Sequence, residues 1–222
     1  IISTPQHYAY LKIAEGCNNR CHYCAIPLIR GPLRSRPLED CVAEARWLAG
    51  EGVKELIVVA QDPTAYGEDW GRPGAVCGLL DALQAIDGIR WIRILYAYPE
   101  RITDEFIAAM VRNPKVVPYL DLPIQHCNDE VLRAMNRRGG RAEIEDAIAR
   151  LRAAIPGLTL RTTLIAGFPG EHLRRWGRGD RHVSAALPGR LPRDRRQCAD
   201  PRRYPAGDRR FLPCDRHRRR YL

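Results

Sequence analysis

The 222-residue sequence has no run of 18 apolar residues, the length that a membrane-spanning helix needs, so no spanning segment is expected. It also lacks a charged start followed by an apolar stretch, so no secretory signal is expected. An initiator Met is missing too, and we expect the chain to be part of a longer protein. Eight cysteines in a chain without a secretory signal favour a reducing, cytoplasmic location.

Lysine is absent from residues 172–222, which contain 16 Arg and 5 Asp and show no helical or strand periodicity. This segment carries a charge of +11, whereas residues 1–171, with 20 Lys and Arg against 21 Asp and Glu, carry −1. A basic arm that binds RNA phosphates would use Lys as readily as Arg. An out-of-frame reading of a GC-rich gene would instead favour Arg. We therefore expect a folded core over 1–171 and a disordered or out-of-frame tail over 172–222.

Within residues 1–171, strand-like and helix-like segments alternate, and the chain is 45% hydrophobic, enough to form a core. Glycine, proline or a capping residue such as Thr103 marks several of the boundaries. Strands are predicted over 8–14, 53–60, 91–98, 116–124 and 158–166, and helices over 36–51, 78–86, 104–111, 129–135 and 142–155.

Polar residues gather directly after these strands: the cysteines after the first, Gln61 and Asp62 after the second, and Gln125 and His126 after the fourth. Strands that alternate with helices form parallel β/α units, and their carboxyl ends are where active sites lie in β/α barrels. The predicted fold class is therefore α/β, a partial β/α (TIM-type) barrel of about five units.

Cys17, Cys21 and Cys24 place three thiols within eight residues of one loop. Thiolates are the preferred ligands of a 4Fe–4S cluster, and three of them leave one iron open to a substrate or cofactor. Zinc is the alternative, although it would require a fourth Cys or His at suitable spacing. The remaining cysteines follow no recognisable spacing and are interpreted as ordinary thiols: Cys41, Cys77, Cys127, Cys198 and Cys214.

The cysteine spacing, with the aromatic Tyr23 before the last cysteine, resembles the signature of radical S-adenosylmethionine (SAM) enzymes. Neighbouring motifs over residues 5–171 resemble the methylthiotransferase family. Within that family, the chain is similar to the RimO branch, which modifies an aspartate of small-subunit ribosomal protein S-twelve, more than to the tRNA-modifying MiaB-like branch. The motifs that carry this similarity are residues 9–17, 26–31, 34–36, 60–67, 96–99, 123–129 and 135–138.

The resemblance implies a radical SAM barrel in which the three cysteines hold a 4Fe–4S cluster whose open iron binds SAM. It further implies addition of a methylthio group to the aspartate β-carbon, with an electron donor as a partner. A second 4Fe–4S cluster is expected in the intact protein, with its ligands in an amino-terminal domain that this chain lacks. The SAM-binding residues that the resemblance implies are Tyr23, Gln61, Gln125, Gly167, Phe168, Pro169, Gly170 and Glu171. Gln61 and Gln125 could instead cap the ends of strands, and Gly167–Gly170 could form an ordinary turn after a strand.

Two alternatives from other classes stay open. The chain could be a noncatalytic basic RNA-binding protein that keeps a metal only for structure, or a nonfunctional fragment of an enzyme. The +11 tail is the feature that keeps the RNA-binding alternative open.

Overall fold

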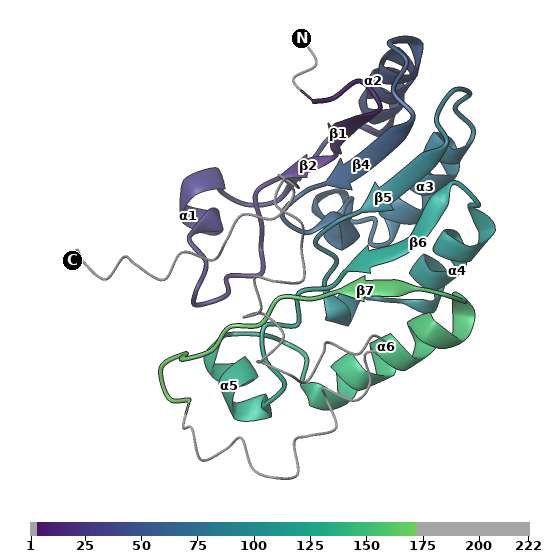
Figure 1. Ribbon diagram of the computed structural model, residues 1–222. Coiled ribbons are helices and arrows are strands. Elements are labelled where there is room, and N and C mark those ends of the chain that lie inside the picture. Colours follow the sequence, from purple (N-terminus) through teal and green to yellow (C-terminus); the bar gives the residue numbers. More distant parts are fainter. Residues whose placement is uncertain (1–3, 172–222) are drawn as a thin grey trace, which may run out of the picture. The chain divides into compact units, whose positions relative to one another are not determined.

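The computed structural model describes residues 4–171, and the predicted tail over 172–222 lies outside the described residues (Figure 1). A five-stranded parallel sheet forms the centre, with its strands side by side in chain order. This confirms the predicted series of parallel β/α units. The strands are β1 (Tyr8–Lys12), β4 (Glu55–Val59), β5 (Trp91–Ile94), β6 (Val116–Asp121) and β7 (Thr159–Arg161).

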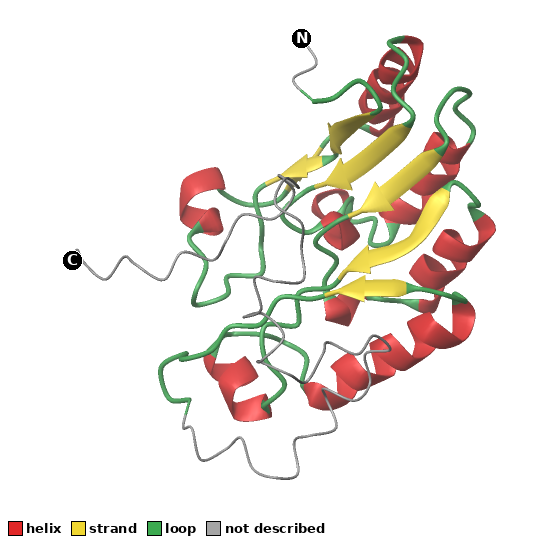
Figure 2. Ribbon diagram, viewed as in Figure 1, coloured by secondary structure: helices red, strands yellow, loops and turns green. Residues whose placement is uncertain are grey.

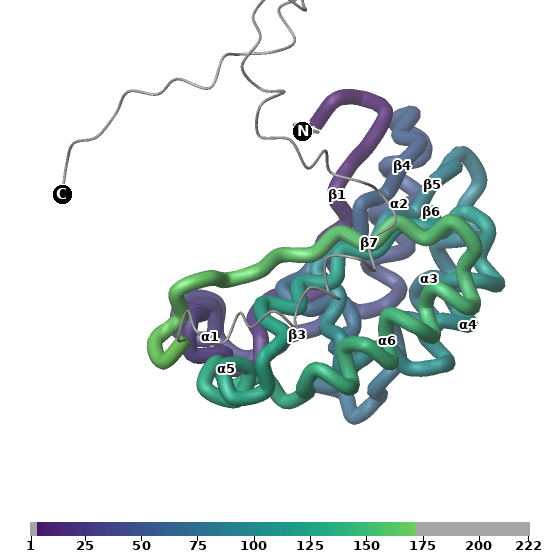
Figure 3. Tube along the Cα trace, turned by 60° about the horizontal axis from the view of Figure 1, so that its bottom comes forward, coloured from purple at the N-terminus to yellow at the C-terminus, as the bar shows by residue number. Residues whose placement is uncertain are grey.

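Four helices follow the strands and lie on one face of the sheet, as Figure 3 shows from a second direction. Consecutive members of this series pack against each other, so the layer follows the order of the strands. The predicted N-cap of the third is confirmed, since the Thr103 side chain accepts a hydrogen bond from Phe106 N at 3.1 Å. The helices are α2 (Leu38–Gly50), α3 (Ala75–Gln84), α4 (Asp104–Arg112) and α6 (Arg141–Ala154).

The core lies between the sheet and this helix layer. Alternate residues of β4 are fully buried, while α3 and α4 bury one face each. Each large apolar side chain removed from water contributes about 1.5–3 kcal/mol, so this core strongly stabilises the fold. Its largest fully buried members include Leu11, Leu56, Leu79, Leu80, Ile92, Phe106 and Leu120.

All five strands are shorter than predicted: β1 ends at Lys12 instead of residue 14, and β4 covers Glu55–Val59 instead of 53–60. β5 ends at Ile94 and not at residue 98, because Tyr96 adopts a positive φ of 67° that a strand cannot accommodate. β6 ends at Asp121 instead of 124, ahead of Pro123, and β7 ends at Arg161 instead of 166. These corrections lengthen the loops that follow the strands, which is where the predicted site residues lie.

Several short elements complete the region beyond the carboxyl ends of the strands, toward which the arrowheads in Figure 2 point. Helix α5 (Asp129–Ala134) was predicted, whereas α1 (Ile26–Arg30) and the antiparallel pair β2 (Ala14–Glu15) and β3 (Arg34–Ser35) were not. Three 3₁₀ turns also lie in the loops: η1 (Pro63–Ala65), η2 (Glu68–Trp70) and η3 (Pro99–Arg101). Within residues 4–171, no helix has both the length and the apolar character needed to cross a membrane.

Candidate active site

The loop that carries the three cysteines begins immediately after β2, at Gly16. This residue has φ +78°, and a Cβ atom there would lie 2.1 Å from the Pro32 carbonyl oxygen. The Cys17 backbone N donates to the Gly31 carbonyl at 3.2 Å, so the loop entrance is held against residues 31–32. Only glycine fits this close approach of two backbone segments.

Residues 20–22 of the same loop are hydrogen-bonded to the C-terminal end of α5 and the residues that follow it. His22 N donates to the Met135 carbonyl at 3.0 Å, and His22 Nδ1 lies 2.7 Å from the Ala134 carbonyl. Because a carbonyl only accepts, Nδ1 carries the proton of this bond. Asn136 Nδ2 also donates to the Arg20 carbonyl at 2.8 Å. Residues more than a hundred positions apart in sequence thus close the loop.

All three cysteines line one cavity of about 340 Å³ beyond the carboxyl ends of the strands. Three of its lining residues hold a strained positive φ without being glycine: Arg20 at 53°, and Tyr96 and Gln125 at 67°. Such strain persists only where surrounding structure enforces it and is concentrated at functional sites. The predicted site residues that the cavity brings together are Cys17, Cys21, Cys24, Tyr23, Gln61 and Gln125.

The predicted turn over Gly167–Glu171 is not among the residues that line this cavity. Its Glu171 carboxylate folds back onto the turn, where Oε2 accepts from Gly167 N at 2.6 Å and from Phe168 N at 3.1 Å. Glu171 Oε1 lies 3.4 Å from His126 Nε2. The turn is therefore internally organised, and the predicted contact of Gly167, Phe168, Pro169, Gly170 and Glu171 with SAM stays a prediction.

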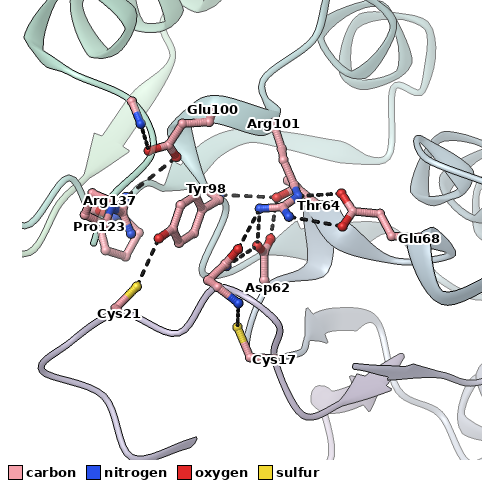
Figure 4. A network of polar contacts seen from close by, with 12 residues as sticks. Cys17, Cys21, Asp62, Thr64, Glu68, Tyr98, Glu100, Arg101, Pro123 and Arg137 are labelled. Atoms are coloured by element: carbon pink, nitrogen blue, oxygen red, sulfur yellow. Dashed lines mark hydrogen bonds and ion pairs between the residues drawn. The ribbon is translucent and has the colours of Figure 1, made fainter. Parts of the chain in front are cut away.

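A buried polar network lies beside the cysteine loop (Figure 4). The Arg101 guanidinium donates to Glu68 through two bonds of 2.6 and 3.0 Å, and to Asp62 Oδ2 at 3.0 Å. Asn19, in the cysteine loop, accepts from Arg101 at 3.1 Å and donates to Asp62 Oδ2 at 2.9 Å. The other Asp62 oxygen accepts from the Thr64 hydroxyl. Burial raises the pKa of Asp62, and the Arg101 charge together with these donors opposes that rise.

A second cluster meets the loop at Cys21, whose Sγ lies 3.1 Å from the Tyr98 hydroxyl (Figure 4). The Arg137 guanidinium lies over the Tyr98 ring, 3.6 Å from its centroid, a cation–π arrangement. Arg137 also donates to the Pro123 carbonyl at 3.2 Å and lies 3.9 Å from a Glu100 carboxylate oxygen. This cluster joins the loops after β5, β6 and α5 to one cysteine.

The loop supplies the right kind of donor for an iron–sulfur cluster, since three soft thiols share one cavity wall. Among residues 4–171, however, no three Cys, His, Asp or Glu side chains are already gathered into a metal-binding group. The Cys17 thiol accepts from Asn19 N at 3.4 Å, and the Cys21 thiol is directed to Tyr98. In residue type and location, the three cysteines fit the group.

Sequence reasoning missed the residues that surround the cysteines. It did not assign a role to Asn19, Tyr98, Arg101 or Arg137, because the partners of these side chains are distant in sequence. The available signal was indirect, namely two arginines and a tyrosine in loops that follow strands, where barrel sites form. Among the other cysteines, Cys41 and Cys77 are buried, as expected for ordinary thiols, and Cys127 is half-buried.

Comparison with known families matches residues 11–177 to the Radical SAM superfamily. The chain is 54% identical over 171 residues to the ribosomal protein uS12 methylthiotransferase RimO of Acetivibrio thermocellus, covering 77% of this chain and 38% of that protein. The RimO protein of Moorella thermoacetica is 58% identical over 171 residues, with 77% and 40% covered. The chain therefore spans about two fifths of the length of these curated relatives.

Solved structures of lower identity share the fold alone. The radical SAM methyltransferase TsrM from Kitasatospora setae superposes with a TM-score of 0.60 at 18% identity, covering 74% of this chain and 32% of that chain. Methylornithine synthase (PylB) gives a TM-score of 0.51 at 14% identity, with 72% and 44% covered. These likenesses confirm the predicted α/β fold class of the barrel type. Because the family match covers well over half of its length, this chain belongs to the radical SAM superfamily.

Proposed function

We propose that this chain is the radical SAM core of a methylthiotransferase that adds a methylthio group to the β-carbon of an aspartate in ribosomal protein uS12. The observation that carries the proposal is the identity of 54–58% to RimO proteins over about 170 residues, together with a family match over residues 11–177 that includes the cysteine loop. Because the chain spans about two fifths of those proteins, the complete reaction requires more sequence than residues 1–222 contain.

In this proposal, Cys17, Cys21 and Cys24 hold a 4Fe–4S cluster and leave one iron open to SAM. When bound, the cluster and SAM together supply the one-electron chemistry that removes hydrogen from an unactivated carbon. The protein's own part is to bind SAM, orient it and keep water away from the reacting atoms.

Gln61 has the clearest fit to a bound cofactor. Its Nε2 donates to Glu15 at 3.2 Å, but its buried Oε1 accepts no hydrogen bond from any described residue, and Gln61 lines the cavity. A buried acceptor without a donor is costly, and a cationic ammonium group such as that of SAM would satisfy it. Tyr23 and Gln125 line the same cavity and are proposed to contact SAM, as is the turn over Gly167–Glu171.

The proposed partners follow from the named relatives. The substrate is ribosomal protein uS12, either free or in the small ribosomal subunit, and an electron donor must reduce the cluster. A second cluster and a second SAM, the source of the methyl group, belong to the intact protein. A ribosomal substrate places the reaction in the cytoplasm.

The division into a core over 1–171 and a basic tail over 172–222 remains a proposal. The nucleotide sequence around codon 171, read in all three frames, tests it. If the tail is out of frame, a shifted frame should restore Thr-Glu followed by an amphipathic helix and a strand. If no frame does so, the basic-arm alternative gains support.

Anaerobic reconstitution with iron and sulfide tests the cluster. The expected result is about four irons per chain with the absorbance of a cubane cluster. Replacing any one of Cys17, Cys21 and Cys24 with Ala should abolish the cluster, whereas the control Cys198→Ala should not. Stoichiometric zinc with no capacity for iron would overturn the assignment.

Release of 5′-deoxyadenosine tests the enzyme class. The reduced, reconstituted chain should release it from SAM, while the Cys17→Ala variant should not. Thiomethylation of a uS12 peptide by residues 1–222 alone is not expected, since they span only about two fifths of the length of the RimO relatives. A cluster-bearing chain that never cleaves SAM would favour a structural metal site in a binding protein instead.

A further inference from the structure

Arg101 lies at the centre of the buried network next to the cysteine loop. Its side chain is 16% exposed, and the Asp62 side chain that it contacts is 1% exposed. Nε, Nη1 and Nη2 all donate, to Glu68, Asp62 and Asn19. A guanidinium can occupy four acceptors at fixed angles in this way, whereas a lysine ammonium cannot.

The cysteine loop joins this network through one residue. Asn19 lies midway between Cys17 and Cys21 and is 8% exposed. Its side-chain oxygen accepts from Arg101, and its side-chain nitrogen donates to Asp62. Its backbone N donates to the Cys17 Sγ at 3.4 Å. The loop centre therefore cannot move without breaking buried, charge-assisted hydrogen bonds, the strong class of such bonds.

The segment that carries Arg101 also reaches the other thiol. Three residues earlier, the Tyr98 hydroxyl lies 3.1 Å from Cys21 Sγ, and Tyr98 N donates to the Thr64 hydroxyl of the same network at 3.3 Å. One short stretch after β5 thus contacts the loop near both Cys17 and Cys21, as Figure 4 shows. These contacts hold the loop against the segment that follows β5, beside the cavity.

We infer that Arg101 is a positioning residue that fixes the cysteine loop through Asn19 and Asp62, so that the thiols already line the cavity before a cofactor binds. Arg101 does not line that cavity, and its role is exerted through Asn19. Asp62, fully engaged in the network, serves the same purpose and not ligand binding. The cluster readout below rests on the proposed function, whereas the thiol readout does not.

The first test measures thiol reactivity in the cofactor-free chain. Native-state alkylation by iodoacetamide, read by mass spectrometry for each cysteine, reports how often the loop opens. Arg101→Lys and Asn19→Ala should each raise the Cys17 rate at least about tenfold, the effect of losing hydrogen bonds to a charged group. Asn19→Ala keeps the pairs of Arg101 with Asp62 and Glu68, so the fold is retained even if Arg101→Lys proves unstable.

Two controls separate positioning from general stability. Arg112→Lys alters a bidentate ion pair with Asp81 on the surface of the helix layer, and it should leave the alkylation rate of Cys17 unchanged. The buried Cys41 and Cys77 report global unfolding in every variant. Unchanged Cys17 rates in both test variants would overturn the inference. So would equal increases at Cys17, Cys41 and Cys77.

A second readout uses the reconstituted chain. Arg101→Lys and Asn19→Ala should lose iron to a chelator at least about tenfold faster than the parent and Arg112→Lys chains, with a broadened electron paramagnetic resonance signal of the reduced cluster. Iron retention and spectra identical to those of the parent would count against the inference. If the parent chain itself takes up no iron, the proposed function fails, and the alkylation rates still decide the role of Arg101.

Discussion

Gly16 offers a sharp test of how the loop entrance is built. Replacing Gly16 with Ala would put a Cβ 2.1 Å from the Pro32 carbonyl oxygen and 2.6 Å from the Gly31 carbonyl oxygen. Both atoms belong to the backbone, so neither can move aside as a side chain would. The φ of +78° adds strain that is specific to residues with a Cβ.

The expected cost of Gly16→Ala has two parts. Holding a non-glycine residue in the left-handed region costs about 1–2 kcal/mol. Forcing the backbone of residues 31–32 away costs about 1–3 kcal/mol more, as overpacking does elsewhere. The free energy of unfolding should therefore fall by about 2–5 kcal/mol, a large share of the stability of a domain this size.

Gly157→Ala is the matched control, because Gly157 has φ +73° but no atom within 4 Å of a Cβ built there. It should lose only the conformational part, about 1–2 kcal/mol. Urea unfolding, monitored by circular dichroism, gives the free energy of unfolding of both variants, and we expect the midpoint to shift while the slope stays constant. If Gly16→Ala costs no more than Gly157→Ala, the close approach at the loop entrance is refuted.

Three further predictions concern other contacts. Tyr98→Phe removes a hydrogen bond to the Cys21 thiolate, and such a bond stabilises the more negative, reduced form of a bound cluster. The midpoint potential should therefore fall by about 20–40 mV in a spectroelectrochemical titration, and an increase would contradict the direction of this bond. Hydrogen bonds from Arg112 lower the pKa of Asp81, so Asp81 stabilises the fold above its usual pKa of 3.8 and loses that effect as pH falls. Asp81→Asn should therefore flatten the fall in stability below about pH 4 in thermal melts, and an unaltered profile would exclude the contribution. Thr103→Ala removes the α4 N-cap and should cost about 1 kcal/mol in urea unfolding, whereas a neutral effect would mean that water replaces the cap.

The order and type of the main elements were predictable, because burial on one face gives helices and strands distinct periods in sequence. The strand ends were not. At Tyr96, local propensity favours a strand, but φ is 67° at the point where the next residue, Ala97, donates its backbone N to the Asp121 carbonyl in the neighbouring strand. The strands β2 and β3 escaped prediction because two-residue strands carry no periodicity.

The cysteines, Tyr23, Gln61 and Gln125 could be placed in one cavity from spacing and from their position after strands. The network around Arg101 could not, since no local pattern shows that residues 19, 62, 68 and 101 meet. A buried guanidinium and a surface one look alike in sequence. What distinguishes them is the set of partners supplied by the fold.

The hydrogen bonds that hold the cysteine loop also set an order of events during translation. The thiols emerge from the ribosome first, yet the loop is held by Asp62, Arg101 and finally by Met135 and Asn136. At about 5–20 residues per second, some 115 residues of further translation take about 6–23 s. During that interval the loop lacks its hydrogen bonds to Met135 and Asn136. Cofactor insertion into a preformed loop therefore has to wait for α5, and a nascent chain stalled before residue 135 would expose reactive thiols to oxidants and to competing metals.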